Sequence, residues 1–204
     1  MNSKLIQTNQ EELNELLQNK QYIDLRYYNL KGLNLSGADL SGANLSYADL
    51  SYADLSNAKL GYAKLGYVDL TGANIELANL TYADLIYANL TKAKLWKANL
   101  WGAKLERVDL SEAKLWEADL TEAKLWKADL WGTYLVQANL WKADLFKADL
   151  WKADLSKANL RETNFAAANI REANFSQAKF IKEAKNLDKT YNIHKAINLI
   201  LPQT

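Results

Sequence analysis

Apolar residues recur every five positions from about residue 23 to residue 182. A large aliphatic or aromatic residue occupies every position divisible by five between 25 and 180, and 27 of these 32 residues are leucine. A small residue lies two positions earlier, and between 38 and 178 it is alanine in 25 of 29 cases. No residue is inserted or deleted in this span. The pattern predicts one repeated unit with two inward positions per five residues.

A period of five excludes a simple α-helix and a flat strand. Residues five apart on an α-helix are separated by about 140°, so the leucines would leave no continuous apolar stripe. On a flat strand, an odd spacing would place successive leucines on opposite faces. A chain that bends after every few residues returns each leucine to the same interior, and stacked coils then bury one continuous column. We therefore expect a solenoid whose alanines fill the corners of a narrow interior.

The pentads identify a family. Residues 38–42 read Ala-Asp-Leu-Ser-Gly, and residues 153–157 read Ala-Asp-Leu-Ser-Lys. The chain resembles the pentapeptide-repeat family, whose motif is a small residue, Asp or Asn, Leu or Phe, and two variable residues, over about 160 of its 204 residues. The resemblance implies an all-β solenoid: a right-handed quadrilateral β-helix with one pentad per side. Eight coils would follow, about 38 Å long at roughly 4.8 Å per coil.

The N-terminal end departs from the repeat and is expected to form a separate segment, residues 1–22. Thr8 or Asn9 can cap a helix, and Leu13, Leu16 and Leu17 then share one side of it. An open solenoid end exposes apolar core and unpaired strand edges. We expect a short N-terminal capping helix that covers this end of the repeat domain, residues 23–182. A partner-binding helix is the alternative.

The C-terminal end changes in two steps. The last four central residues are Phe165, Ile170, Phe175 and Phe180, and we expect these larger side chains to fill the column where it ends. The five-residue rhythm fails after residue 182, so residues 183–204 are expected to form a C-terminal cap. Apolar residues between 187 and 201, followed by Pro202, predict a short helix or an irregular cap. A homodimer contact through this tail is the alternative.

Aromatic residues form the candidate interaction surface. Each directly follows a central leucine, a position that the family geometry points outward. The set is Trp96, Trp101, Trp116, Trp126, Trp131, Trp141, Phe146 and Trp151. If four pentads make one coil, residues twenty positions apart lie over one another. We then expect Trp96 to stack on Trp116, Trp131 on Trp151, and Trp126 on Phe146. We also expect Tyr47, Tyr67 and Tyr87 to stack on one another. Three uses remain open: rings that cover strand backbone, a protein–protein or self-association surface, and stacking on sugars or single-stranded bases.

Two further aromatic contacts follow from the same coil phase. Tyr62 is expected to stack on Tyr82, and Arg107 is expected to lie near the ring of Tyr87.

The charge distribution argues against mimicry of DNA, and the net charge gives no general attraction to nucleic acid, which we do not expect as a partner. Lys plus Arg is 25 and Asp plus Glu is 24, a net charge of +1. Under four-fold phasing, the side centred on residues 30 to 170 carries a net −3 and the side centred on 25 to 165 a net +3. The acidic side includes the column Asp49, Asp69, Asp109, Asp129 and Asp149. Some family members act on DNA gyrase as duplex mimics, but DNA carries a charge about every 1.7 Å over its whole surface. The leading hypothesis is a non-catalytic scaffold for an unidentified protein partner, and a DNA-mimic modulator of gyrase is the alternative.

Catalytic and cofactor chemistry finds no support in the residue types. There is no cysteine, and the single histidine, His194, has no evident partner in the sequence. Asp and Asn before each central residue are explained by side-chain bonds to backbone at the bends. We therefore expect no enzyme, no cofactor and no metal site. The N-terminus lacks the apolar core of a signal peptide and no run approaches a membrane span, so we expect a cytoplasmic protein without a membrane association.

Overall fold

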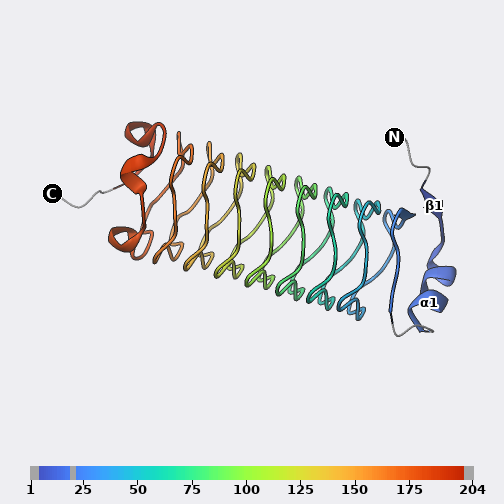
Figure 1. Ribbon diagram of the computed structural model, residues 1–204. Coiled ribbons are helices and arrows are strands. Elements are labelled where there is room, and N and C mark those ends of the chain that lie inside the picture. Colours follow the sequence, from blue (N-terminus) through green and yellow to red (C-terminus); the bar gives the residue numbers. More distant parts are fainter. Residues whose placement is uncertain (1–4, 19–21, 200–204) are drawn as a thin grey trace.

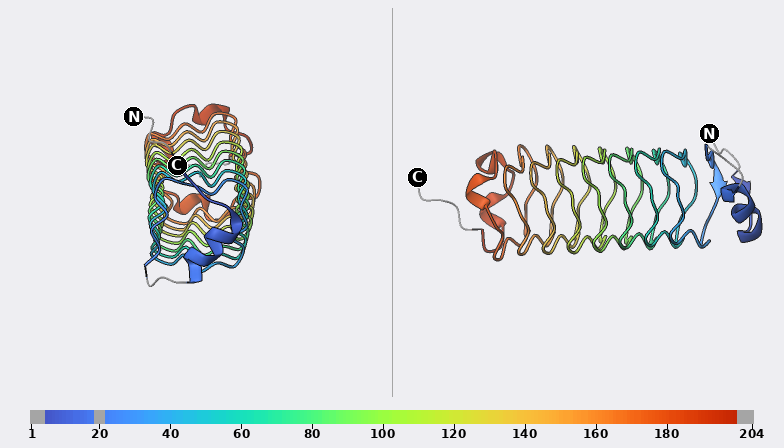
Figure 2. Two further views of the ribbon diagram at one scale, coloured as in Figure 1. Left: turned by 90° about the vertical axis from the view of Figure 1, so that its right-hand side faces the viewer. Right: turned by 90° about the horizontal axis from the view of Figure 1, so that it is seen from below.

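The computed structural model describes residues 5–18 and 22–199, which form a straight column of stacked coils (Figure 1). Helix α1 (Gln10–Gln18) lies at one end, and three short 3₁₀ turns lie at the other. Viewed along the column axis, successive coils superimpose in a four-sided outline (Figure 2).

Each coil contains twenty residues, because residue i pairs with residue i + 20 through parallel β-bridges. Asp49 pairs with Asp69, for example, and Asp109 with Asp129. Four positions per coil pair in this way, one in each pentad, so the column has four faces. We number the faces by their inward residues: face I contains 25, 45 and onward to 165; face II contains 30 to 170; face III contains 35 to 175; and face IV contains 40 to 160.

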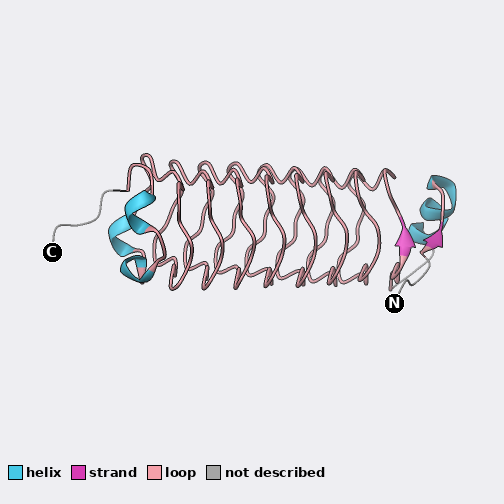
Figure 3. Cartoon of the chain, turned by 90° about the horizontal axis from the view of Figure 1, so that it is seen from above, coloured by secondary structure: helices cyan, strands magenta, loops and turns pink. Residues whose placement is uncertain are grey.

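The four faces are sheets made of very short segments. Within the described residues, only β1 (Ile6–Gln7) and β2 (Tyr28–Asn29) extend over two residues, and the other pairings are single bridges (Figure 3). Each bridging residue is followed by an inward residue and then by two turn residues. Leu50 N–H donates to the carbonyl of Asp69 at 2.7 Å, and Tyr52 N–H donates to that of Thr71 at 2.9 Å. These repeated hydrogen bonds between coils replace long strands.

The second turn residue has a left-handed backbone in every pentad from residues 23–27 to residues 173–177. Glycine adopts this conformation readily, as Gly32 does at φ 66°. Most of these positions hold other residues, such as Tyr67 at φ 59° and Lys147 at φ 58°. A non-glycine residue in this region costs roughly 1–2 kcal/mol. The cost is offset locally, because the same residue donates its N–H to the next coil, as Lys147 does to Ala166 at 3.0 Å.

The bridging residue stabilises the turn that follows it. The side chain of Asp49 accepts a hydrogen bond from the N–H of Ser51 at 2.9 Å, and Asn99 accepts one from Trp101 at 3.0 Å. Short polar side chains favour such bonds to backbone two residues ahead. The prediction that Asp and Asn serve the bends is therefore confirmed.

The interior of the column is solid. The inward leucines and the corner alanines from Ala43 to Ala173 are almost completely buried, and the space between Leu110 and Leu145 leaves no room for a water molecule. Thr133 and Thr163 replace alanine at two corners, and both are fully buried. Each hydroxyl donates to a backbone carbonyl, Leu110 at 2.8 Å and Leu140 at 2.7 Å. Buried polar groups are therefore satisfied here, as the low dielectric of a core requires.

The N-terminal segment covers the edge of the first coil. Asn9 caps helix α1, because its side-chain oxygen accepts the N–H groups of Glu11 and Glu12 at 3.0 Å. Leu13 is fully buried against the column. The side-chain amide of Gln10 donates to the carbonyl of Asn34 at 2.8 Å and accepts its N–H at 2.7 Å, as a neighbouring strand would. Strand β1 pairs in parallel with β2 beside it.

The C-terminal segment corrects one expectation, the inward placement of Phe180. Phe180 is not an inward residue: it is 49% exposed, with φ 58°. The described tail contains no α-helix but three 3₁₀ turns, Ile181–Glu183, Leu187–Lys189 and Ile193–Lys195. The turns lie on a further coil whose units have six residues. Bridges now join residues 164 and 185, 169 and 191, and 174 and 197, so the spacing lengthens from 21 to 23. Residues 200, 201 and 202, predicted as part of the cap, lie outside the described residues.

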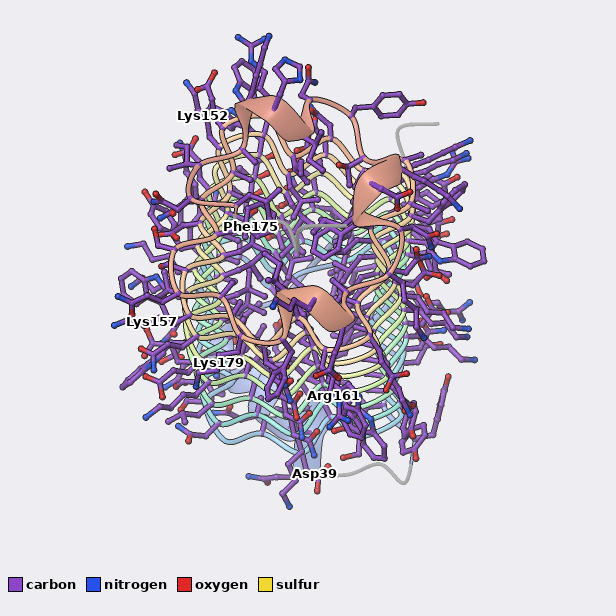
Figure 4. All side chains as sticks on the ribbon, turned by 90° about the vertical axis from the view of Figure 1, so that its left-hand side faces the viewer. Asp39, Lys152, Lys157, Arg161, Phe175 and Lys179 are labelled. Carbon is purple, nitrogen blue, oxygen red and sulfur yellow. The ribbon has the colours of Figure 1, made fainter. Side chains whose placement is uncertain are left out.

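Phe165 and Phe175 behave as predicted. Both are buried, and their rings meet edge to face with centroids 6.1 Å apart. Figure 4, viewed from the C-terminal end, shows Phe175 inside the outline of the column.

Candidate interaction surface

The predicted aromatic residues lie on the outside of the column, at the first turn residue after an inward leucine. Six tryptophans are between 37% and 47% exposed, and Trp151 and Phe146 are half-buried. The structure distributes them as one pair per face rather than as a single patch. The pairs are Trp126 and Phe146 on face I, Trp131 and Trp151 on face II, Trp96 and Trp116 on face III, and Trp101 and Trp141 on face IV.

Tyrosines stack as the coil period predicts. The rings of Tyr47 and Tyr67 lie 4.9 Å apart, and Tyr67 and Tyr87 lie at the same distance. Tyr27 extends this ladder on face I at 5.2 Å from Tyr47. The guanidinium of Arg107 lies 5.4 Å from the centroid of Tyr87, so the column of rings continues into a cation.

Tyr62 and Tyr82 also stack as predicted, with centroids 5.4 Å apart.

Tryptophan rings pack less regularly than the tyrosines. Trp126 meets Phe146 edge to face at 6.5 Å, not as the parallel stack we expected. The ring contact of Trp116 is with Tyr134, at 6.2 Å and an interplanar angle of 78°. Lysines cover several indoles: Lys97 lies 4.7 Å from the ring of Trp96. An indole ring is wider than the distance between neighbouring coils. The orientation of each tryptophan ring is therefore set by the side chains that surround it.

A shallow groove on face III brings two of the predicted tryptophans together. Its volume is about 620 Å³, and its apolar lining consists of Trp96, Trp116, Tyr134 and Val136. Sequence reasoning did not select Tyr134 or Val136. Tyr134 replaces the usual Asp or Asn, and Val136 breaks the outward series of tryptophan and serine, so both departures from the repeat mark the groove.

Polar residues border this groove. Glu117, Gln137 and Asp154 complete its lining. Lys97 lies 3.5 Å from Glu117 and forms an ion pair with this lining residue. The pair is exposed and therefore contributes little stability. The groove thus has an apolar centre and a polar rim, the arrangement typical of protein interfaces.

The predicted acidic residues do form one column. Bridges connect Asp49 to Asp69 and Asp109 to Asp129 and onward to Asp149, and Asn89 fills the gap between Asp69 and Asp109. Each of the five carboxylates accepts the N–H two residues ahead at 2.9 to 3.0 Å. The column is therefore explained in part by the turns that it stabilises.

Three ionisable groups have perturbed pKa values, and each has a local cause. Hydrogen bonds from Ser41, followed by that from Lys59, lower the pKa of Asp39. The hydrogen bond from Lys185, followed by that from Trp141, lowers the pKa of Glu162. The hydrogen bond to Asp24 raises the pKa of Arg26. All three lie on the surface, and each belongs to an exposed ion pair: Asp39 with Lys59, Glu162 with Lys185, and Arg26 with Asp24.

Within residues 5–18 and 22–199, no group of three His, Asp or Glu side chains is placed to hold a metal ion. No helix in those ranges has the length and apolar character needed to cross a membrane.

The family model for pentapeptide repeats matches the chain in overlapping segments that run from residue 24 to residue 182. The chain belongs to the pentapeptide-repeat family, and the right-handed β-helical solenoid that members of this family form is confirmed as its fold class. No curated protein matches the chain.

Solved structures of the same family resemble the chain. A trypsin-treated variant of QnrB1, a plasmid-mediated fluoroquinolone resistance protein, is 16% identical over 89% of each chain, with a TM-score of 0.66. HetL, a protein involved in heterocyst differentiation regulation from the cyanobacterium Nostoc sp. strain PCC 7120, is 28% identical over 92% of this chain and 98% of its own, with a TM-score of 0.38. The similarity to QnrB1 shows the fold alone.

Proposed function

We propose that this protein is a non-catalytic scaffold that holds a protein partner against its outer surface. The single observation that carries the proposal is the groove on face III, where Trp96, Trp116 and Tyr134 gather exposed aromatic surface within a polar rim. Aromatic residues in such settings dominate the energetics of protein interfaces. The solid interior supports the same conclusion, because recognition is left to outward side chains.

The DNA-mimic alternative is weaker on the same evidence. A duplex mimic needs acidic charge over much of its surface. Here the acidic column occupies face II, and the neighbouring face I carries a net +3. A gyrase supercoiling assay tests the alternative: inhibition or quinolone protection at micromolar protein would favour it over the scaffold proposal.

Affinity capture from the source cell tests the proposed partner surface. The variant is Trp96→Ser with Trp116→Ser, and the matched control is Trp101→Ser with Trp141→Ser on face IV. Serine already occupies the same turn position at Ser156, so we expect both variants to fold. A partner retained by wild type and by the control, and lost by the face III variant, is the expected result. Equal retention by all three proteins contradicts the proposal.

Two further expectations belong to this proposal. The cytoplasmic location stays a prediction, which cell fractionation tests. A homodimer contact through the C-terminal segment is the untested alternative to a simple cap; Phe180, Tyr191 and Ile197 expose apolar surface there, at 49%, 62% and 47%. Removal of residues 184–204 would abolish such a dimer.

A further inference from the structure

Faces I and II carry opposite charge in matched columns. On face I, the bridging column reads Asp84, Lys104, Lys124 and Asp144, and the second-turn column reads Tyr87, Arg107, Lys127 and Lys147. On face II, the bridging column reads Asn89, Asp109, Asp129 and Asp149, and the second-turn column reads Lys92, Glu112, Gly132 and Lys152. The net charges of the whole faces are +3 and −3.

A second copy of the chain carries its charges at the same axial spacing as these columns. Both copies rise by about 4.8 Å per coil, so charges aligned on one coil stay aligned on the next. If two copies lie side by side with parallel axes, the order of columns is reversed across the contact. The second-turn column of face I then lies opposite the bridging column of face II, and the bridging column of face I opposite the second-turn column of face II.

Coil-by-coil alignment then opposes unlike charges throughout. Across one side of the contact, Arg107 faces Asp109, Lys127 faces Asp129, and Lys147 faces Asp149. Across the other side, Asp84 faces Lys92, Lys104 faces Glu112, and Asp144 faces Lys152. No like charges meet in these columns. Electrostatic complementarity of this kind selects the partner and fixes the register of a contact.

The centre of the same contact is aromatic. Trp126 and Phe146 of face I lie at the coils that carry Trp131 and Trp151 of face II. Trp126 is 47% exposed. An aromatic centre with charged margins is the usual arrangement of a specific interface.

Other arrangements of neighbouring faces are worse. Face II against face III opposes Lys92 to Lys94 and Asp109 to Glu117. Face III against face IV opposes Glu117 to Asp119 and Asp154 to Glu162. Face IV against face I gives three unlike pairs, half as many as face I against face II.

An antiparallel contact between faces I and II is also worse. With both aromatic pairs kept in register, it opposes Lys127 to Lys152 and Asp144 to Asp129. Parallel axes are therefore favoured.

We infer that face I of one copy packs against face II of a second copy, and that four copies close into a ring with parallel column axes. Faces I and II are neighbouring sides of a four-sided column, so each contact rotates the next copy by about 90°. Four such rotations close a cyclic assembly, whereas other angles between the two faces would leave a different number of copies or an open filament.

The size of one face is sufficient for such a contact. A face of eight coils is about 38 Å long and at most about 16 Å wide, from the spacing of coils and the length of five extended residues. Each contact therefore buries at most about 1,200 Å² in total, at the lower limit for a specific interface, and ring closure gives every copy two contacts. Face III, with its groove, stays outside the ring, so this inference goes beyond the proposed partner site and does not depend on it.

Sedimentation equilibrium of the full chain tests the ring. One chain has a mass of 23.1 kDa, so wild type at micromolar concentration is expected at about 92 kDa. A first variant, Lys127→Glu with Lys147→Glu, makes face I acidic and is expected to be monomeric. A second variant, Asp129→Lys with Asp149→Lys, makes face II basic and is also expected to be monomeric. Both changes suit the fold, because Glu112 and Lys124 already occupy the same kinds of position.

Mixing the two variants separates assembly from folding damage. In an equimolar mixture, the acidic face I of the first variant meets the basic face II of the second, and the unaltered faces of the two also match. The tetramer is therefore expected to return. The matched control, Lys157→Glu with Lys179→Glu, changes exposed lysines on faces III and IV (Figure 4) and is expected to remain tetrameric.

Several results would overturn the ring. These are a wild type that is monomeric at 100-fold higher protein concentration, a wild-type dimer, a tetramer that survives either charge reversal, and a mixture that stays monomeric. The groove variant Trp96→Ser with Trp116→Ser is expected to keep the tetramer mass, so failure of the partner proposal and failure of the ring give different results.

Discussion

Adding volume at one corner of the column is expected to destabilise it strongly. Ala118 is fully buried at a corner of face IV, and its carbonyl accepts the N–H of Asn139 on the next coil at 2.9 Å. Ala118→Leu adds three carbon atoms where the neighbouring interior has no room for a water molecule. Extra methylene groups in a packed core cost typically about 1–3 kcal/mol, and this site cannot relax without separating two coils. We expect a loss of at least about 3 kcal/mol in the free energy of unfolding.

Guanidinium unfolding monitored by tryptophan fluorescence measures this loss. The matched control is Lys94→Leu, which places the same side chain at an exposed bridging position of face III. Surface changes of this kind are usually within about 0.5 kcal/mol of wild type. The reasoning is refuted if Ala118→Leu unfolds at the wild-type midpoint, or if the two variants lose the same stability.

Three further substitutions test local features. Gly102→Ala places a Cβ against the ring of Tyr82 at a φ of 64°, so unfolding experiments should show a loss of about 1–2 kcal/mol; wild-type stability would contradict this. Thr133→Val removes one buried hydroxyl donor but keeps its volume, so the loss should stay below about 1.5 kcal/mol, and a larger loss would mean that the hydroxyl has another role. Ser41→Ala should raise the pKa of Asp39 in an NMR titration, because Ser41 is the main cause of its lowering. Because the pKa of Asp39 is lowered in the folded protein, its ionised carboxylate stabilises the fold at pH values above the ordinary pKa near 3.8. This stabilisation is lost as the pH falls through the pKa of the folded state. An unchanged Asp39 pKa in the Ser41→Ala variant would contradict the assigned cause.

The column itself was predictable because every pentad faces the same constraint. An inward residue at each multiple of five, with alanine two positions earlier, requires a chain that bends in every pentad to bury both positions. The four-sided cross-section came from the family resemblance. The tyrosine ladder of Tyr47, Tyr67 and Tyr87 was predictable for the same reason: once four pentads make a coil, flat rings twenty residues apart lie directly over one another.

The orientation of the tryptophans was not predictable from the period. Trp116 turns its edge toward Tyr134, a residue on the next coil that replaces the usual Asp or Asn. The orientation of a tryptophan ring depends on the size of the side chains around it. The twenty-residue spacing of the coils predicts which residues are neighbours but not how their rings pack. The groove on face III was missed because it results from these irregular neighbours.

The prediction for the last coil was wrong because the repeat unit lengthens from five to six residues at Phe180, a residue that still fits the five-residue pattern. Phe180 is a multiple of five and apolar, yet it lies at the exposed start of a six-residue unit. The missed signal is a run of asparagines, Asn186, Asn192 and Asn198, each six residues from the next and each with positive φ. Asparagine tolerates this conformation better than most residues, so its spacing marks the turns.

A crystal structure of the protein would show whether the chain forms a β-helical column with a dry interior. We expect inward leucines stacked about 4.8 Å apart along the axis, with no ordered water between them and the tryptophans outside. Water-filled space along that axis, or the same leucines on the faces of packed α-helices, would contradict it.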